Sequence, residues 1–208
     1  MAFLGIRINP DVGRLLKDIE VPGENESPSE YHITLLCFDD NWAIEKVSAA
    51  LEATYDVISD ISPFTIKVDT VTCFPKREDK PIPIIAKVEG SKLHNLRDKL
   101  AKKFDKEGID FLKTFKEFKP HITLSYYDSD KEIDDIKIDP VEISIFEIVL
   151  WAGDHGDDRL FITFPLKGPK SRKRAAFLLQ KANMFNKMAN NEPQKYLTST
   201  YERRLFSR

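Results

Sequence analysis

The sequence carries the tetrapeptide His-Ile-Thr-Leu twice, beginning at His32 and again at His121. In a β-strand, side chains two positions apart project from the same face. His32 and Thr34 would therefore point together, as would His121 and Thr123, while the intervening Ile and Leu side chains enter a packed layer. If the two strands lie side by side, two imidazoles and two hydroxyls line one cleft.

Such a set suits phosphoryl chemistry. An imidazole has an ordinary pKa of about 6.5, so one histidine can accept a proton from an attacking hydroxyl while the other donates one to a leaving oxygen. The threonine hydroxyls can donate hydrogen bonds to the non-bridging phosphate oxygens. A single His-x-Thr is more simply a half-buried strand histidine beside a threonine with β propensity. The matched pair favours catalysis by His32, Thr34, His121 and Thr123.

The remaining histidines and the cysteines do not extend this set. His94 falls at the start of a predicted helix and His155 in a predicted turn, where a solvated side chain is expected. A zinc site is a weak alternative, because no histidine has convincing ligand spacing to another histidine, a cysteine or a carboxylate. Cys37 and Cys73 lack Cys-x-x-Cys spacing and predict two reduced thiols. We expect neither a metal nor a cofactor.

The elements that would position the two motifs repeat along the chain. Each half contains a strand, a helix with an apolar stripe, and a strand that bears His-Ile-Thr-Leu. In the first half the pattern predicts a strand at 3–8, a short helix at 12–19, a loop at 21–29, a strand at 31–38, a helix from 44 to 55 capped by Asp40 or Asn41, and a strand at 63–74. In the second half it predicts a strand at 82–88, a helix capped by Ser91 and ended by Gly108, and strands at 121–127, 142–151 and 159–164, the last two around a turn at 153–157.

The composition describes a folded chain with no membrane span. Of the 208 residues, 41% are hydrophobic and 11% aromatic, which is enough to form a core. No apolar run approaches the roughly 20 residues of a spanning helix, and the first residues lack the basic start of a signal peptide. We expect a cytoplasmic protein, in the host cytoplasm if the protein is viral.

The charge is divided unevenly. Residues 169–208 hold ten Lys and Arg against two Glu, which leaves 22 basic and 32 acidic residues in the preceding body. An acidic body binds extended nucleic acid poorly, so a small nucleotide or an RNA end is the more plausible substrate. Apolar residues at helical spacing follow the basic run from Lys170. The sequence thus predicts a domain at 1–167 and a basic helical extension at 168–208, which docks on the body, on another subunit, or on a protein or RNA partner.

With both motifs in these contexts, the chain resembles the 2H phosphoesterases, which are named for two His-x-Thr or His-x-Ser motifs and include the LigT-like RNA 2',3'-cyclic phosphodiesterases. Three further segments carry the likeness, which covers residues 1–167: Thr70-Val-Thr-Cys-Phe-Pro75, Glu147-Ile-Val-Leu-Trp151 followed by Phe161, and Phe164-Pro-Leu166. The resemblance implies an α+β fold with a bilobal, pseudo-twofold arrangement. Two antiparallel sheets would form a central cleft with the helices outside.

The resemblance also implies a function. It is that of a metal-independent phosphodiesterase that opens a 2',3'-cyclic phosphate or cleaves a 2',5'-linked or cyclic oligonucleotide. By resemblance the first histidine, His32, is more often the acid, although the residues themselves leave the direction open. A narrower variant is a phage enzyme that degrades cyclic oligonucleotide immune signals. The alternative from another class is a catalytically silent module that binds RNA or a nucleotide and is recruited to an assembly through its basic tail.

One departure from the family pattern concerns the positive charge that would bind the phosphate. Many relatives carry Arg or Lys shortly after the second motif, whereas this chain continues as Ser-Tyr-Tyr at 125–127. Candidate substrate-binding residues are the cations Arg7, Lys76 with its neighbour Arg77, and Lys119, and the aromatic residues Phe74, Tyr126 and Trp151. The aromatic side chains, like that of Tyr127, could stack on a base, but packing in the core is an equal or better explanation for each.

Overall fold

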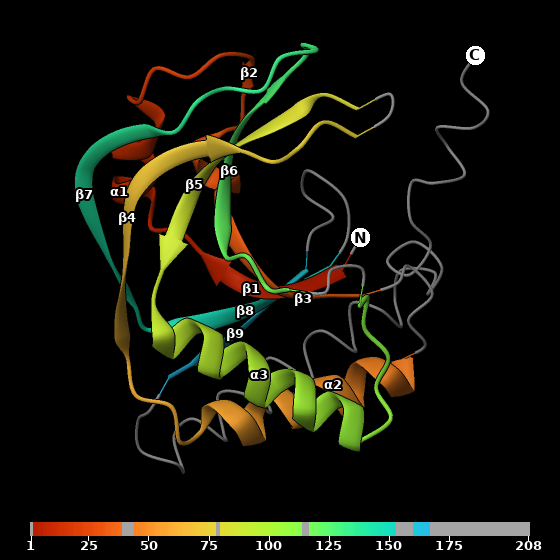
Figure 1. The fold of residues 1–208 in the computed structure, drawn as a ribbon. Coiled ribbons are helices and arrows are strands. Elements are labelled where there is room, and N and C mark those ends of the chain that lie inside the picture. The colour runs from red at the N-terminus through yellow and green to blue at the C-terminus, as the bar shows by residue number, and fades with distance from the viewer. Residues whose placement is uncertain (1, 39–43, 78–79, 114–116, 153–159, 167–208) are drawn as a thin grey trace.

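The computed structural model describes residues 2–38, 44–77, 80–113, 117–152 and 160–166 (Figure 1). The caps expected at Asp40 or Asn41, the turn at 153–157 with His155, and the extension at 168–208 lie outside these residues. Two antiparallel sheets make up the body, a four-stranded sheet in the order β3-β1-β8-β9 and a five-stranded sheet in the order β2-β6-β5-β4-β7. The strands are β1 Ala2–Arg7, β2 Glu24–Asn25, β3 His32–Phe38, β4 Phe64–Cys73, β5 Ile82–Glu89, β6 His121–Tyr127, β7 Ile136–Ile145, β8 Glu147–Ala152 and β9 Leu160–Pro165.

The chain passes between the sheets more than once. It runs from β1 in the four-stranded sheet to β2 in the five-stranded sheet and back to β3, enters the five-stranded sheet again at β4, and returns between β7 and β8. Neither sheet therefore consists of one continuous half of the sequence, although each contains one motif strand. This arrangement confirms the predicted bilobal α+β fold.

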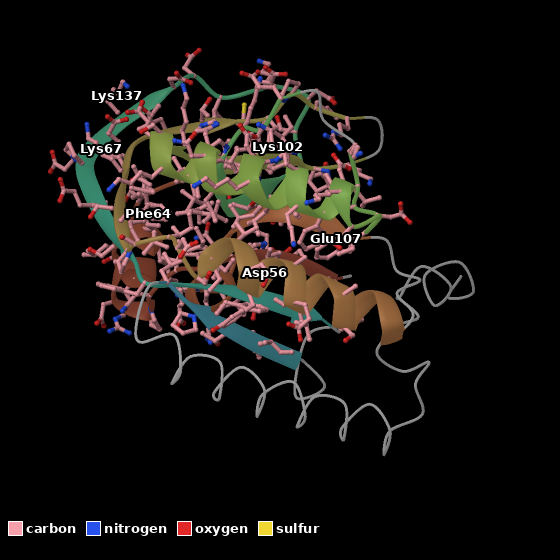
Figure 2. All side chains as sticks on the ribbon, turned by 90° about the horizontal axis from the view of Figure 1, so that it is seen from below. Asp56, Phe64, Lys67, Lys102, Glu107 and Lys137 are labelled. Atoms are coloured by element: carbon pink, nitrogen blue, oxygen red, sulfur yellow. The ribbon has the colours of Figure 1, made fainter. Side chains whose placement is uncertain are left out.

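Two helices cover the four-stranded sheet from outside. The helices are α1 Pro10–Lys17, α2 Ile44–Ile58 and α3 Ser91–Lys106. Figures 1 and 2 show α2 and α3 side by side, and in the view of Figure 1 they lie below the four-stranded sheet, where α2 contacts β9 and α3 contacts β3. The rings of Phe38 and Phe104 stack with their centroids 5.8 Å apart and join β3 to α3. No helix among the described residues is long and apolar enough to cross a membrane.

The core explains the apolar half of each motif. Ile33 and Leu35 on β3 are 0% and 3% exposed, and Ile122 and Leu124 on β6 are both 0% exposed. Complete burial of such a side chain contributes about 1.5–3 kcal/mol, so these residues fix which face each strand turns inward. The histidines and threonines between them are consequently held on the opposite face. This outcome confirms the predicted alternation.

The structure corrects several of the sequence-based element boundaries. The strand predicted at 142–151 is two strands, because the chain changes sheets at the exposed Phe146, which β periodicity alone does not reveal. Ser91 is the first residue of α3 rather than its cap, since Gly90 occupies that position without a side-chain hydrogen bond. The short β2 lies inside the predicted loop at 21–29, and β7 begins six residues before the predicted start.

Candidate active site

The two motif strands have the same local register. On β3, Thr34 lies opposite Gly5 of β1 but Leu36 lies opposite Leu4, so one residue of the motif strand has no partner. On β6, Thr123 lies opposite Ile85 of β5 and Ser125 lies opposite Ile84, which gives the same irregularity at the same place. A β-bulge therefore follows each threonine. This repeated bulge shows that β1-β3 and β5-β6 are equivalent pairs.

Both imidazoles are anchored in the same way. The Nδ1 atom of His32 lies 2.6 Å from the carbonyl oxygen of Glu30, and that of His121 lies 2.7 Å from the carbonyl oxygen of Lys119. Because a carbonyl can only accept, each Nδ1 carries the hydrogen in these bonds. The Nε2 atom of each ring is then the one left for exchanging a proton with a ligand.

Aromatic side chains hold the His32 ring. The Phe3 ring stacks on it at 4.5 Å between centroids, and the Trp151 ring lies at 5.4 Å. Gly5 lies beside this contact on β1, where an added Cβ would stand 2.6 Å from the carbonyl oxygen of Ile33 and 3.1 Å from the Phe3 ring. The absence of a side chain at Gly5 therefore lets Phe3 reach His32. Trp151 is only 4% exposed, so it packs against the site and does not form an open platform.

His121 has a different environment. Its ring meets the edge of the half-buried Phe74 ring at 4.6 Å in a nearly perpendicular arrangement. Burial lowers the pKa of His121, a hydrogen bond to the backbone of Lys119 opposes this effect, and the charge of His32 lowers the pKa further. The two histidines are thus close enough to interact electrostatically, and the neutral form of His121 is favoured.

The strands that carry the two histidines meet across the sheets. β3 is the edge strand of its sheet, and it contacts β6 of the other sheet without hydrogen bonding to it. Thr34 and Thr123 are both half-buried and lie on the same strand faces as the histidines. The structure therefore brings together the four residues that the sequence singled out. It does so through contact between two sheets, not through pairing within one.

A basic residue lies opposite each histidine. Arg7 of β1 pairs with His32, and Lys87 of β5 pairs with His121, so each shares a sheet face with its histidine. Arg7 is exposed, and its guanidinium carbon lies 5.6 Å from the centre of the Phe161 ring. Lys87 was missed in the sequence because only the strand register places it beside the second motif. The signal that could have found it is its position in β5, which matches that of Arg7 in β1.

The other candidate cations are not paired with a motif histidine in the strand register. The exposed Lys119 side chain has its ammonium 4.0 Å from a carboxylate oxygen of Glu117, and only its backbone carbonyl contacts His121. The Lys76 ammonium pairs with Asp130. Arg77 is exposed in the loop that follows.

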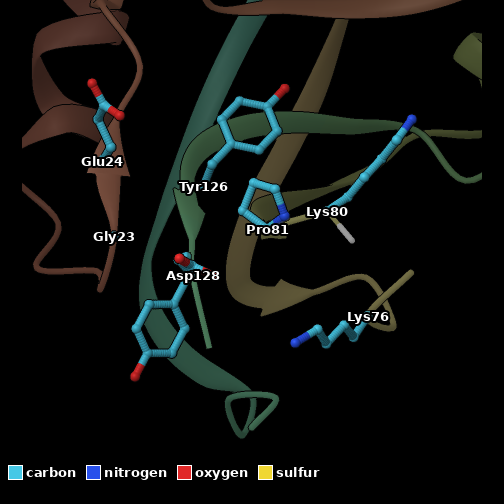
Figure 3. Close-up of a pocket in the computed structure, with 8 residues that line it drawn as sticks. Gly23, Glu24, Lys76, Lys80, Pro81, Tyr126 and Asp128 are labelled. Atoms are coloured by element: carbon cyan, nitrogen blue, oxygen red, sulfur yellow. The ribbon is translucent and has the colours of Figure 1, made fainter. Parts of the chain in front are cut away.

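Lys76 and Tyr126 both line a pocket near the end of β6 (Figure 3). The pocket has a volume of about 1140 Å³, and Figure 3 shows the Lys76 side chain extending toward it, with Tyr126 and Pro81 close together on another side. Its lining residues are Gly23, Glu24, Lys76, Lys80, Pro81, Tyr126, Tyr127 and Asp128. Tyr126 follows the bulge on β6, three residues after Thr123, so the pocket and the second motif share a strand.

The structure also places the other histidine and the two cysteines that the sequence analysis considered. His94 on α3 is exposed and meets the edge of the Phe118 ring at 5.3 Å. Cys37 and Cys73 are both free thiols and half-buried. Within the described ranges there is no group of three or more His, Cys, Asp and Glu side chains that could hold a metal ion.

Solved structures with this fold come from several proteins. A protein of Thermus thermophilus matches with a TM-score of 0.65 and 19% identity, over 80% of this chain and 98% of that one. E. coli LigT complexed with 3'-AMP matches with a TM-score of 0.59 and 16% identity, over 80% and 98% of the two chains. LigT complexed with NADP+ has a TM-score of 0.55 and 19% identity, over 80% and 94%. No curated protein sequence matches the chain.

A family model agrees with these fold matches. The model of the 2'-5' RNA ligase superfamily matches residues 25–157, a stretch that contains both His-x-Thr motifs and most of the two sheets. The chain therefore belongs to the 2'-5' RNA ligase superfamily, the 2H phosphoesterases.

Proposed function

We propose that the protein is a metal-independent phosphodiesterase that hydrolyses a nucleotide substrate through His32 and His121. The observation that carries this proposal is the matched pair of imidazoles, each with its Nδ1 atom bonded to a backbone carbonyl and each next to a threonine on the same face. General acid and base catalysis needs two such groups, with pKa values near neutral pH, on either side of a phosphate.

We assign the two roles from the surroundings of the rings. Because burial lowers the pKa of His121 and favours its neutral form, its Nε2 atom takes the proton from the attacking water. The water oxygen forms a bond to phosphorus as the bond from phosphorus to the 2' or 3' oxygen breaks. His32 gives its Nε2 proton to that leaving oxygen. Thr34 and Thr123 donate hydrogen bonds to the non-bridging oxygens, where negative charge gathers.

A nucleotide substrate is supported by the relatives and by the pocket. LigT has been solved with 3'-AMP, with ATP and with NADP+. In this chain the pocket near the end of β6 combines tyrosine rings with two lysines, which suits a base and a phosphate of a substrate longer than one nucleotide. We therefore include 2',5'-linked and cyclic oligonucleotides among the proposed substrates. Cyclic oligonucleotides would be the substrates if the protein is a phage enzyme that degrades immune signals.

The substrate class is tested with metal-free protein. Protein treated with EDTA is incubated with 2',3'-cyclic AMP, 2',5'-linked oligoadenylate and cyclic oligonucleotides, and the products are resolved by chromatography. A double variant, His32→Ala with His121→Ala, serves as the control for contaminating hydrolases. We expect turnover of at least one substrate by the native protein and none by the variant. Binding of these ligands without turnover would instead support the silent nucleotide-binding module.

A further inference from the structure

A phosphate held between two histidines and two threonines still needs positive charge. Threonine hydroxyls are neutral donors, and charge builds on the non-bridging oxygens as the reaction proceeds. The body of the chain is acidic, with 32 acidic against 22 basic residues in 1–168, so its overall field repels an anion. The positive charge must therefore come from particular side chains on the catalytic face. This inference rests on the proposed function and concerns the same site.

The strand register identifies two such side chains. Arg7 lies opposite His32, and Lys87 lies opposite His121. The backbone around them also matches, because the N–H group of Ile8 donates to the Tyr31 carbonyl at 3.0 Å and that of Val88 donates to the Pro120 carbonyl at 3.1 Å. In both halves, the residue after the cation is thus bonded to the residue before the histidine. Arg7 and Lys87 are therefore equivalent positions of the pseudo-twofold fold.

Other lysines near this face are already engaged. Next to Lys87 on β4 is Thr70, whose hydroxyl accepts from the Lys137 ammonium at 2.7 Å and donates to Asp69 at 2.8 Å. Lys67 forms an ion pair with the same Asp69 at 2.9 Å. Lys87 is exposed, and no ion pair of its ammonium is found within the described part of the chain. Directly opposed residues have Cβ atoms about 5 Å apart, so a lysine chain from this position can reach a phosphate beside His121.

We propose that Lys87 is the phosphate-binding cation of the second motif, in place of the basic residue that many relatives carry after their second His-x-Thr. The charge is then supplied from the neighbouring strand β5 and not from β6 itself. Together, Arg7 and Lys87 place one positive charge beside each histidine. The ligand class is a phosphate monoester or diester anion, held by Lys87 through its non-bridging oxygens.

The test compares four proteins: the native chain, Lys87→Met, Lys87→Arg, and Lys102→Met as a matched control on the exposed surface of α3 (Figure 2). Two quantities are measured, kcat/KM for the substrate found in the metal-free assay, and the affinity for inorganic phosphate followed through the His121 ring signals by NMR. We expect Lys87→Met to lower kcat/KM about 10- to 100-fold and to weaken phosphate binding, as loss of a charged hydrogen bond does. Lys87→Arg should recover most of both, and all four proteins should melt at the same temperature.

The outcomes separate the two proposals. If Lys87→Met behaves like Lys102→Met in both measurements, Lys87 does not bind the phosphate. A loss that Lys87→Arg fails to recover would also overturn the inference, because it would assign the effect to side-chain shape. If the native protein turns over no substrate, the proposed function fails, and the phosphate titration still decides whether Lys87 holds the anion.

Discussion

At the scale of single residues, the two catalytic candidates share an anchor but differ in their surroundings. Each imidazole bonds through Nδ1 to a backbone carbonyl two residues earlier in the chain. His32 is stacked on Phe3, whereas His121 is half-buried against the edge of Phe74 and feels the charge of His32. This asymmetry within a symmetric pair is the ground on which we propose His121 as the base and His32 as the acid.

The lowered pKa of His121 gives a pH prediction. Because burial and the charge of His32 both disfavour the imidazolium form, His121 remains an effective base below its ordinary pKa of about 6.5. We expect the acidic limb of kcat/KM to fall at a pH lower than that value, and the His121 ring signals to titrate at the same pH by NMR. Titration of His121 at or above about 6.5 would contradict its assignment as the base.

The same shift affects stability. The unfolded chain takes up a proton at His121 at a higher pH than the folded chain does. The free energy of unfolding should therefore decrease as the pH falls through about 6.5, and a His121→Gln variant should show a shallower decrease. Urea unfolding at several pH values measures both. An equal pH dependence in the two proteins would mean that folding does not shift the pKa of His121.

A prediction for Gly5 tests the contact between Phe3 and His32. In Gly5→Ala the new methyl group would lie 2.6 Å from the Ile33 carbonyl oxygen, so the strands must shift. We expect the free energy of unfolding to fall by about 1–3 kcal/mol and turnover to fall as well. Gly108→Ala is the control, since its φ of +65° costs about 1–2 kcal/mol, with nothing within 4 Å of the added atom. Turnover of Gly108→Ala should be unchanged, and unchanged turnover in Gly5→Ala would refute the role of this contact.

At the scale of elements, most of the strands could be predicted from the sequence, whereas the pairing of one strand with another could not. The predicted strand at 121–127 matches β6, because alternation of buried residues with the motif is strong there. The exchange of sheets at Phe146 was not predictable, since residues 142–151 read as one continuous strand. The position of Lys87 beside His121 was hidden for the same reason, because register belongs to the pairing of strands and not to either strand alone.

The strand β6 also connects the site to the pocket in Figure 3, which yields a prediction on substrate length. Tyr126 is 41% exposed and lines the pocket three residues beyond Thr123. We expect Tyr126→Ala to raise KM about 10-fold for an oligonucleotide, through the loss of base stacking, and to leave 2',3'-cyclic AMP unaffected. Steady-state kinetics on the two substrates measures this difference. Equal effects on both would place Tyr126 outside any additional nucleotide site.

At the scale of the whole molecule, the fold is a pseudo-twofold assembly. Each motif strand pairs on one side with the strand that carries Arg7 or Lys87, and it contacts the other motif strand on the opposite side. Among the residues that the structure describes, the buried core runs from Leu4 to Leu166, within the proposed domain at 1–167. A protein truncated after Lys167 should therefore unfold in one cooperative transition and retain the kcat of the full chain. Denaturation and kinetics of the truncated protein test this expectation. Failure to fold would make the 168–208 extension part of the domain.

The central claim is that His32 and His121 act as one acid and base pair, and a double-mutant cycle on kcat/KM in metal-free buffer tests it most directly. Groups that act as a unit are strongly non-additive, so His32→Ala and His121→Ala should each lower kcat/KM by orders of magnitude. The double variant should then lose little more than either single variant. Losses that add fully, or a single variant with native turnover, would contradict the account.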